Sequence, residues 1–126
     1  MHELSIARSI VEIVTEQAQR QGSGRVVGVT LRIGRLAAVH EQALRYGFTL
    51  VAEDTPLAGA SLAVIEVPLR IWCPVCVAEV ELPGIQRLAC PTCGHLSGDI
   101  RAGQELEIES ILTDGDGPRP KPLEKS

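Results

Sequence analysis

Two cysteine pairs decide the fold of this 126-residue chain: Cys73-Pro74-Val75-Cys76 and, thirteen residues later, Cys90-Pro91-Thr92-Cys93-Gly94. A gap of two residues lets both thiolates of a pair bind one cation, and two pairs complete a tetrahedron at about 2.3 Å per sulfur. Proline after the first cysteine presets a turn, and Gly94 permits the left-handed backbone that often closes one. The spacing therefore predicts a zinc-ribbon module in which Cys73, Cys76, Cys90 and Cys93 bind a structural zinc ion.

Three other uses of four cysteines have to be weighed against zinc. A rubredoxin-like iron site uses the same ligands, but such sites usually lie among aromatic residues, and this chain has one Trp, one Tyr and one Phe. Two disulfides would need an oxidising compartment. A catalytic zinc needs an open coordination position, which four thiolates do not leave. We therefore expect a structural metal and no enzymatic activity.

Charge and hydropathy narrow the class of protein further. The formal net charge is −4, and Lys or Arg residues do not cluster outside the extreme C-terminus, which argues against nucleic acid as a partner. Apolar runs are too short to cross a membrane. Glu3, Glu12 and Glu16 interrupt the first apolar segment, so it does not resemble a secretory signal. We expect a cytoplasmic protein, and a reducing compartment favours metal binding over disulfides.

Hydrophobic periodicity predicts the elements around the cysteines. Apolar residues at three- and four-residue steps from Leu4 to Ala18 predict an amphipathic helix that ends before Gly22-Ser23-Gly24. Alternation over 27–33 predicts a strand that ends at Gly34. A second helix is expected from about Glu41 to Thr55-Pro56, and further strands over 61–67 and 106–110.

The order helix, strand, helix, strand, metal module, strand predicts an α+β fold. We expect a small mixed sheet with two helices, completed by a last strand that returns from the inserted zinc ribbon. The expected domains are residues 1–69 with 104–113 for the α/β part and residues 70–103 for the zinc-binding part. Residues 114–126 contain three prolines and are expected to form a flexible, solvated tail.

The first three residues, Met1-His2-Glu3, carry a second set of metal ligands. The terminal amine, the His2 amide nitrogen and the His2 imidazole can form fused chelate rings around one ion, and Glu3 could add its amide nitrogen or carboxylate. Nitrogen-rich, near-planar coordination suits Ni(II) or Cu(II). The alternative is that His2 is an ordinary residue of a frayed terminus, and these three residues alone leave both interpretations open. For His40, just before the second helix, a capping or surface role is expected.

Several motifs together resemble the HypA/HybF family of hydrogenase nickel-incorporation proteins. They are Met1-His2-Glu3-Leu4-Ser5, Leu31-Arg32-Ile33-Gly34, Ala43-Leu44-Arg45-Tyr46-Gly47-Phe48, Thr55-Pro56-Leu57-Ala58-Gly59-Ala60, the two cysteine pairs and Gly103-Gln104-Glu105-Leu106. A Met-His-Glu start combined with paired cysteine motifs is far more specific than either feature alone. The resemblance covers the chain up to about Thr113.

This resemblance implies a nickel metallochaperone that serves the maturation of [NiFe] hydrogenase. Met1, His2 and Glu3 would then form the nickel site, and the four cysteines would hold zinc. The implied partners are a nickel-handling GTPase of the maturation pathway and the hydrogenase large-subunit precursor. The competing hypothesis is a zinc-ribbon interaction or nucleic-acid-binding module without a nickel function.

Overall fold

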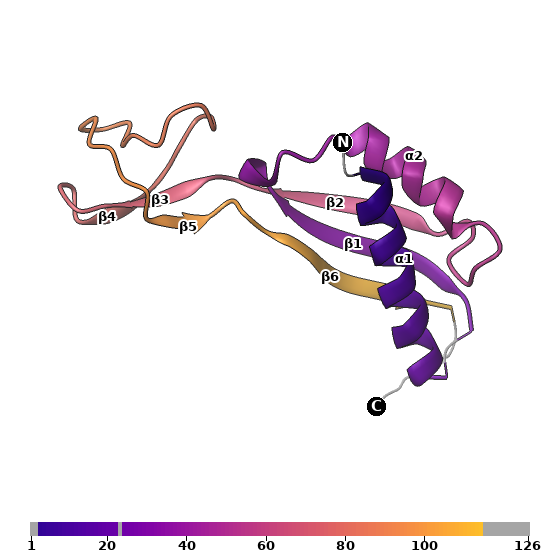
Figure 1. The fold of residues 1–126 in the computed structure, drawn as a ribbon. Coiled ribbons are helices and arrows are strands. Elements are labelled where there is room, and N and C mark those ends of the chain that lie inside the picture. Colours follow the sequence, from indigo (N-terminus) through magenta and orange to yellow (C-terminus); the bar gives the residue numbers. More distant parts are fainter. Residues whose placement is uncertain (1–2, 23, 115–126) are drawn as a thin grey trace. The chain divides into compact units, whose positions relative to one another are not determined.

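The structure is a computed structural model that describes residues 3–22 and 24–114. Its elements are α1 (Glu3–Arg20), β1 (Val26–Gly34), a 3-10 turn (Arg35–Ala37), α2 (Glu41–Ala52), β2 (Ser61–Val67), β3 (Arg70–Cys73), β4 (Ala78–Glu81), β5 (Ile100–Ala102) and β6 (Leu106–Thr113) (Figure 1). The predicted order of helices, strands and cysteine module is confirmed. Within the described ranges, no helix is both long and apolar enough to cross a membrane.

The strands form two three-stranded sheets, ordered β2-β1-β6 and β4-β3-β5. In the first sheet, β6 runs antiparallel to β1. The Gly34 amide donates to the Glu105 carbonyl at one end of the pair, and the Asp114 amide donates to the Arg25 carbonyl at the other end. The second sheet is antiparallel, with β3 between β4 and β5. The predicted fold class, two helices with small sheets and an inserted ribbon, is confirmed.

Contacts divide the chain into two compact units. We call residues 3–22, 24–31, 39–63 and 108–114 the helical unit. We call residues 32–38 and 64–107 the ribbon unit. The boundaries fall within β1, β2 and β6, so each of these strands contributes residues to both units. The separation at residues 70 and 103 into a nickel-binding and a zinc-binding domain stays a prediction.

In the helical unit, α1 buries one stripe of its surface. The buried apolar residues are Ala7, Ile10, Val11, Val14 and Ala18. Leu4, predicted to lie on the same stripe, is 49% exposed. The two helices pack against each other, and a Cβ on Gly47 of α2 would lie 3.4 Å from Leu4 Cδ1 and 3.6 Å from Ala7 Cβ. These are ordinary van der Waals distances, so the helices lie close enough for a methyl group at position 47 to touch α1.

The ribbon unit has an apolar core of its own. Leu69, Ile71 and Leu82 are buried, and Leu36, Val80, Leu88 and Ile100 pack against them. The structure shows a small core, which depends on residues on both sides of the cysteine pairs.

A close backbone contact between Gly34 and Gly103 lies in the ribbon unit. A Cβ on Gly34 would lie 2.1 Å from the carbonyl carbon and oxygen of Gly103, and Gly103 itself has a φ of +115°. The same Gly103 carbonyl accepts a hydrogen bond from the Leu36 amide at 2.8 Å. This contact gives a physical reason for glycine at both positions.

Candidate metal centre

A tight hairpin positions the first cysteine pair. Strands β3 and β4 pair with Cys73 opposite Ala78, so the four residues between them form the turn that carries Cys76. The Cys76 amide donates to Cys73 Sγ at 3.4 Å. In the second pair, the Gly94 amide donates to the Cys90 carbonyl at 2.8 Å. Both pairs are thus held by short-range hydrogen bonds, from a backbone amide to a sulfur in the first pair and to a backbone carbonyl in the second.

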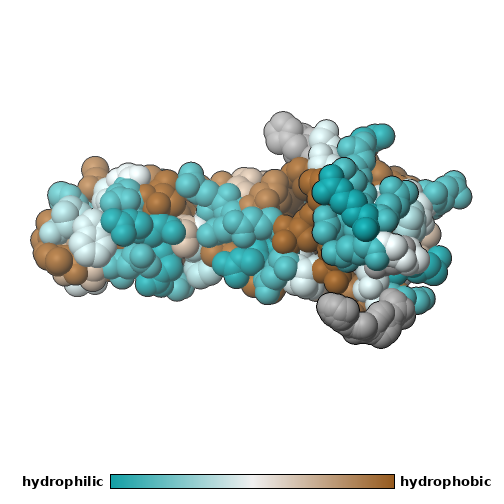
Figure 2. All heavy atoms as spheres, turned by 90° about the horizontal axis from the view of Figure 1, so that it is seen from below, coloured by the Kyte–Doolittle hydropathy of each residue, from teal (hydrophilic) through white to brown (hydrophobic). Residues whose placement is uncertain are grey.

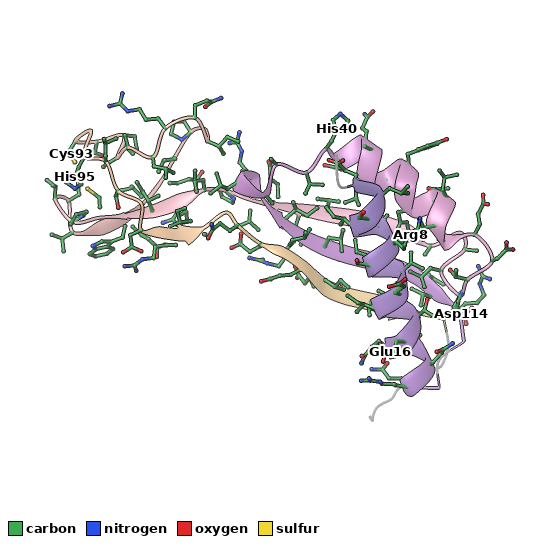
Figure 3. The ribbon with its side chains drawn as sticks, in the orientation of Figure 1. Arg8, Glu16, His40, Cys93, His95 and Asp114 are labelled. Atoms are coloured by element: carbon green, nitrogen blue, oxygen red, sulfur yellow. The ribbon has the colours of Figure 1, made fainter. Side chains whose placement is uncertain are left out.

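The four cysteine sulfurs converge on one point. Each lies within 4.8 Å of the others, with 3.5 Å between Cys73 and Cys93 and 3.8 Å between Cys76 and Cys90. Sulfurs at about 2.3 Å from a tetrahedral ion are about 3.8 Å apart. All four cysteines are free, and Cys93 is exposed (Figure 3). The donor set therefore fits a metal ion of zinc's size and softness.

Hydrogen bonds to the sulfurs separate the acidities of the thiols. The backbone amides of Cys93 and Thr92 lower the pKa of Cys90 to about 6, although burial opposes this effect. Hydrogen bonds with the thiols of Cys93 and Cys90 raise the pKa of Cys76 to about 12. Amides directed at a sulfur stabilise its thiolate, which is the form that binds metal. These amide hydrogen bonds therefore favour the thiolate form of Cys90.

The two cysteine pairs end in the same backbone conformation with different residues. Gly94, after the second pair, has a φ of +81°, and Val77, at the corresponding place after the first pair, has a φ of +52°. A left-handed conformation is strained for a β-branched residue. The Val77 side chain is 70% exposed, so core packing does not compensate for this strain. Sequence reasoning missed this feature, although aligning the two pairs would have revealed it.

Charged residues of the ribbon unit neutralise one another. Arg70 pairs with Glu79 at 3.0 Å and with Glu81 at 3.5 Å. Arg101 forms two hydrogen bonds of 2.9 Å with Asp99, which lower the pKa of Asp99, and its guanidinium lies 5.1 Å from the centre of the Trp72 ring. Because both arginines are paired with acidic side chains, they do not form a basic surface. This pairing weakens the hypothesis of a nucleic-acid-binding module.

His95 lies beside the exposed Cys93 in Figure 3. It is exposed, its backbone carbonyl accepts a hydrogen bond from the Cys90 amide, and its imidazole does not join the cysteine cluster. His95 is therefore an exposed loop histidine.

The predicted nickel ligands lie only partly within the described chain. Met1 and His2 fall outside the described residues. Glu3 is 7% exposed, and its Oε2 accepts a hydrogen bond from the His40 amide at 2.8 Å. The predicted capping role of His40 is confirmed, because its Nδ1 accepts a hydrogen bond from the Ala43 amide at 3.1 Å. Figure 3 shows His40 at the start of α2.

Taken together, the fold and the site define a small α+β metal-binding protein with a four-thiolate ribbon. Comparison with known proteins makes the assignment specific. Residues 1–113 match the family model described as hydrogenase/urease nickel incorporation, metallochaperone, hypA. The chain belongs to this HypA family.

Individual relatives agree with the family match. The chain is 47% identical over 113 residues to the hydrogenase maturation factor HypA of Chloroflexus aggregans, a match that covers 90% of this chain and 99% of the relative. It is 40% identical over 111 residues to the factor of the same name from Acidithiobacillus ferrooxidans, covering 88% and 97%. The family assignment thus rests on nearly the full length of these relatives.

Solved structures support the fold. The solution structure of the Ni metallochaperone HypA from Helicobacter pylori superimposes with a TM-score of 0.63 at 19% identity, covering 90% of this chain and 97% of that one. A second HypA solution structure gives a TM-score of 0.64 at 20% identity, covering 90% and 96%.

Proposed function

We propose that this protein binds Ni(II) at its N-terminus and delivers it during the maturation of [NiFe] hydrogenase. The observation that carries the proposal is the match of residues 1–113, which include Met1-His2-Glu3, to a nickel-incorporation family. The proposed ligands are the terminal amine, the His2 amide and imidazole, and Glu3. The protein itself then catalyses no reaction.

The environment of Glu3 supports a specific role for this residue. Its carboxylate is buried and accepts a hydrogen bond from the His40 amide. We therefore propose that the Glu3 carboxylate fixes the start of α1, with Glu3 as one of the nickel ligands. A fixed third residue limits the conformations open to the two ligating residues before it and lowers the entropic cost of binding.

We propose that the four-cysteine cluster binds zinc and that the protein acts in the cytoplasm. Sulfur separations of 3.5 and 3.8 Å suit tetrahedral zinc. Elemental analysis of protein purified without added metal tests the identity of the ion. One zinc per chain is expected. A red protein that contains iron would instead indicate a rubredoxin-like centre.

Delivery requires partners, and we propose two: a nickel-handling GTPase of the maturation pathway and the hydrogenase large-subunit precursor. A terminal site can exchange its ligands one at a time with an acceptor, so transfer need not pass through free Ni(II). Copper binds such nitrogen ligands more tightly than nickel, so selectivity has to come from geometry, docking and metal supply.

Delivery is tested by nickel incorporation into a hydrogenase precursor in the presence of a chelator that removes free nickel. The nickel-loaded protein should support incorporation under these conditions, and the His2→Ala variant should not. Equal incorporation by the two proteins, or by nickel salt alone, would contradict delivery from the N-terminal site. The protein would then remain a zinc-ribbon interaction module.

A further inference from the structure

Two large hydrophobic side chains of α2 are exposed in the helical unit. Tyr46 is 69% exposed and Leu50 is 47% exposed, and residues four apart lie on the same face of a helix. Gly47 follows Tyr46, and a Cβ at this glycine would lie 3.4 Å from Leu4 Cδ1 of α1. Leu4 is itself 49% exposed. Leu4, Tyr46 and Leu50 therefore form one apolar surface that spans the two helices.

Single exposed hydrophobic residues are common in folded proteins and need no explanation. Figure 2 shows hydrophobic residues among hydrophilic ones on one face of the molecule. Ile13 of α1 is 55% exposed, but it lies beside a different element, the strand β6. The surface across α1 and α2 differs because three large side chains adjoin. One of them is a tyrosine, a residue that is enriched at the energetic centres of protein interfaces. This contiguous apolar surface therefore suits an interaction with another protein.

An arginine without a partner lies beside this surface. Arg8 is exposed and follows Leu4 by one helical turn, and Figure 3 shows it on the side of α1 that faces α2. The other arginines of the helical unit each bind an oxygen within the unit: Arg20 binds Glu16 at 2.8 Å, Arg45 binds Glu41 at 2.9 Å and Arg25 binds the Ala58 carbonyl. Within residues 3–22 and 24–114, no hydrogen bond or ion pair reaches the Arg8 guanidinium. Residues 115–126 of the predicted tail lie outside this range. Arg8 is thus free to pair with a carboxylate of another molecule.

The surface begins at the residue that follows the proposed nickel ligands. Glu3 is the first residue of α1, and Leu4 is the next. Under the proposed function, nickel leaves the N-terminus by exchange of its ligands one at a time. The accepting protein then has to bring its own ligands to Glu3 and the two residues before it, so it has to dock on the adjoining surface.

We propose that Leu4, Arg8, Tyr46 and Leu50 form the docking surface for the protein that accepts nickel. We call these four residues the acceptor patch. This inference rests on the proposed function, and its occupant is the hydrogenase large-subunit precursor, which contributes a carboxylate to Arg8 and apolar side chains to Tyr46 and Leu50. Arginine binds a carboxylate through two parallel hydrogen bonds, which fixes the orientation of the partner. A second copy of this chain is a poorer occupant, because it would bring its own Arg8 and the patch contains no acidic residue to pair with it.

Binding of the zinc-loaded, nickel-free chain to the immobilised precursor tests the patch separately from nickel transfer. Tyr46→Ser and Leu50→Ser should each raise the Kd about tenfold, whereas the matched control Ile13→Ser should not change it. Matching urea midpoints would show that these variants keep the fold.

The charge of the patch is tested at Arg8. Arg8→Glu should raise the Kd about tenfold or more, and Arg8→Lys should raise it less, because lysine keeps the charge and loses the paired hydrogen bonds. Arg87→Glu, an equal change of charge in the ribbon unit, should leave the Kd unchanged. Equal effects of Arg8→Glu and Arg87→Glu would reduce the role of Arg8 to net charge and overturn the proposed carboxylate contact.

Several results would overturn the docking surface as a whole. They are the absence of binding by the unsubstituted chain, an unchanged Kd in both Tyr46→Ser and Leu50→Ser, and an equal loss in Ile13→Ser. Self-association that Leu50→Ser abolishes, or weakened binding of the nickel-handling GTPase alone, would assign the patch to a different occupant and would also overturn it.

Calorimetry with nickel separates this inference from the proposed function. The patch variants should bind nickel as tightly as the unsubstituted chain, because none of the substituted residues is a proposed ligand. A chain that binds the precursor through the patch and binds no nickel would contradict the proposed function and support the docking surface.

Discussion

The carboxylate of Glu3 accepts a hydrogen bond from the backbone amide of His40, with 2.8 Å between Oε2 and the nitrogen, although the two residues are 37 positions apart in the sequence. His40 also caps α2 by accepting the Ala43 amide at its Nδ1. One residue thus joins the first turn of α1 to the first turn of α2. The proposed nickel site begins immediately before this connection.

Removing the Glu3 carboxylate is expected to destabilise the helical unit. Glu3→Ala leaves the His40 amide without this acceptor, and hydrogen bonds to charged groups contribute about 1.5–3 kcal/mol. We predict a loss of about 1–3 kcal/mol in the free energy of unfolding, measured by urea denaturation, and a smaller loss for Glu3→Gln. The exposed Glu12→Ala is the control and should change stability by less than about 0.5 kcal/mol. Equal effects of Glu3→Ala and Glu12→Ala would contradict the role assigned to this hydrogen bond.

Substitutions after the two cysteine pairs should have opposite effects. Val77→Gly relieves a strained left-handed residue, a gain of about 1–3 kcal/mol that is partly offset by the chain entropy of glycine, about 0.5–1 kcal/mol. Gly94→Val introduces the same strain. In competition with a chromophoric chelator, Val77→Gly should bind zinc several-fold more tightly and Gly94→Val several-fold more weakly. Weaker binding by Val77→Gly would show that Val77 makes a stabilising contact that outweighs its backbone strain.

The contact between Gly34 and Gly103 leaves no space for a methyl group. A Cβ on Gly34 would lie 2.1 Å from the Gly103 carbonyl, so Gly34→Ala has to move one backbone against the other. We predict a loss of at least about 3 kcal/mol in stability, in the range of severe core substitutions. Gly24→Ala is the matched control, because a Cβ there meets no atom within 4 Å. Similar thermal midpoints for the two variants would refute this assignment.

Trp72 provides an intrinsic probe of the metal centre. It is the only tryptophan, it precedes Cys73 in β3, and Arg101 lies 5.1 Å from the centre of its ring. Because zinc binding is coupled to the folding of small modules, removal of zinc by a chelator should shift the Trp72 fluorescence, and added zinc should restore it. Magnesium should have no effect, because it prefers oxygen ligands. Fluorescence that does not respond to chelation would contradict a structural role for the metal.

Local patterns in the sequence were sufficient to predict most of the fold. Hydrophobic periodicity placed both helices and the strands β1, β2 and β6, because burial of one face repeats every two or about 3.6 residues. The spacing of the cysteines predicted a metal cluster, since two residues between thiols suffice to direct them at one ion. Leu4 was the exception within α1, because a residue at the end of a stripe can lie at the edge of the buried face.

Contacts between distant residues could not be predicted in this way. The hydrogen bond from His40 to Glu3 depends on how the two helices meet, and the approach of Gly34 to Gly103 depends on how β6 returns to β1. Val77 has a left-handed backbone conformation that valine disfavours, so residue preferences predict a different conformation at this position. In each case tertiary contacts determine the conformation, and local patterns in a single sequence do not specify those contacts directly.

The most direct test of the central claim is a calorimetric nickel titration of zinc-loaded protein that retains its native, untagged Met1, beside the His2→Ala variant. The account predicts saturable binding of about one nickel per chain by the unsubstituted protein and the loss of this binding in His2→Ala. Absent binding, or binding that is the same in both proteins, would contradict an N-terminal nickel site.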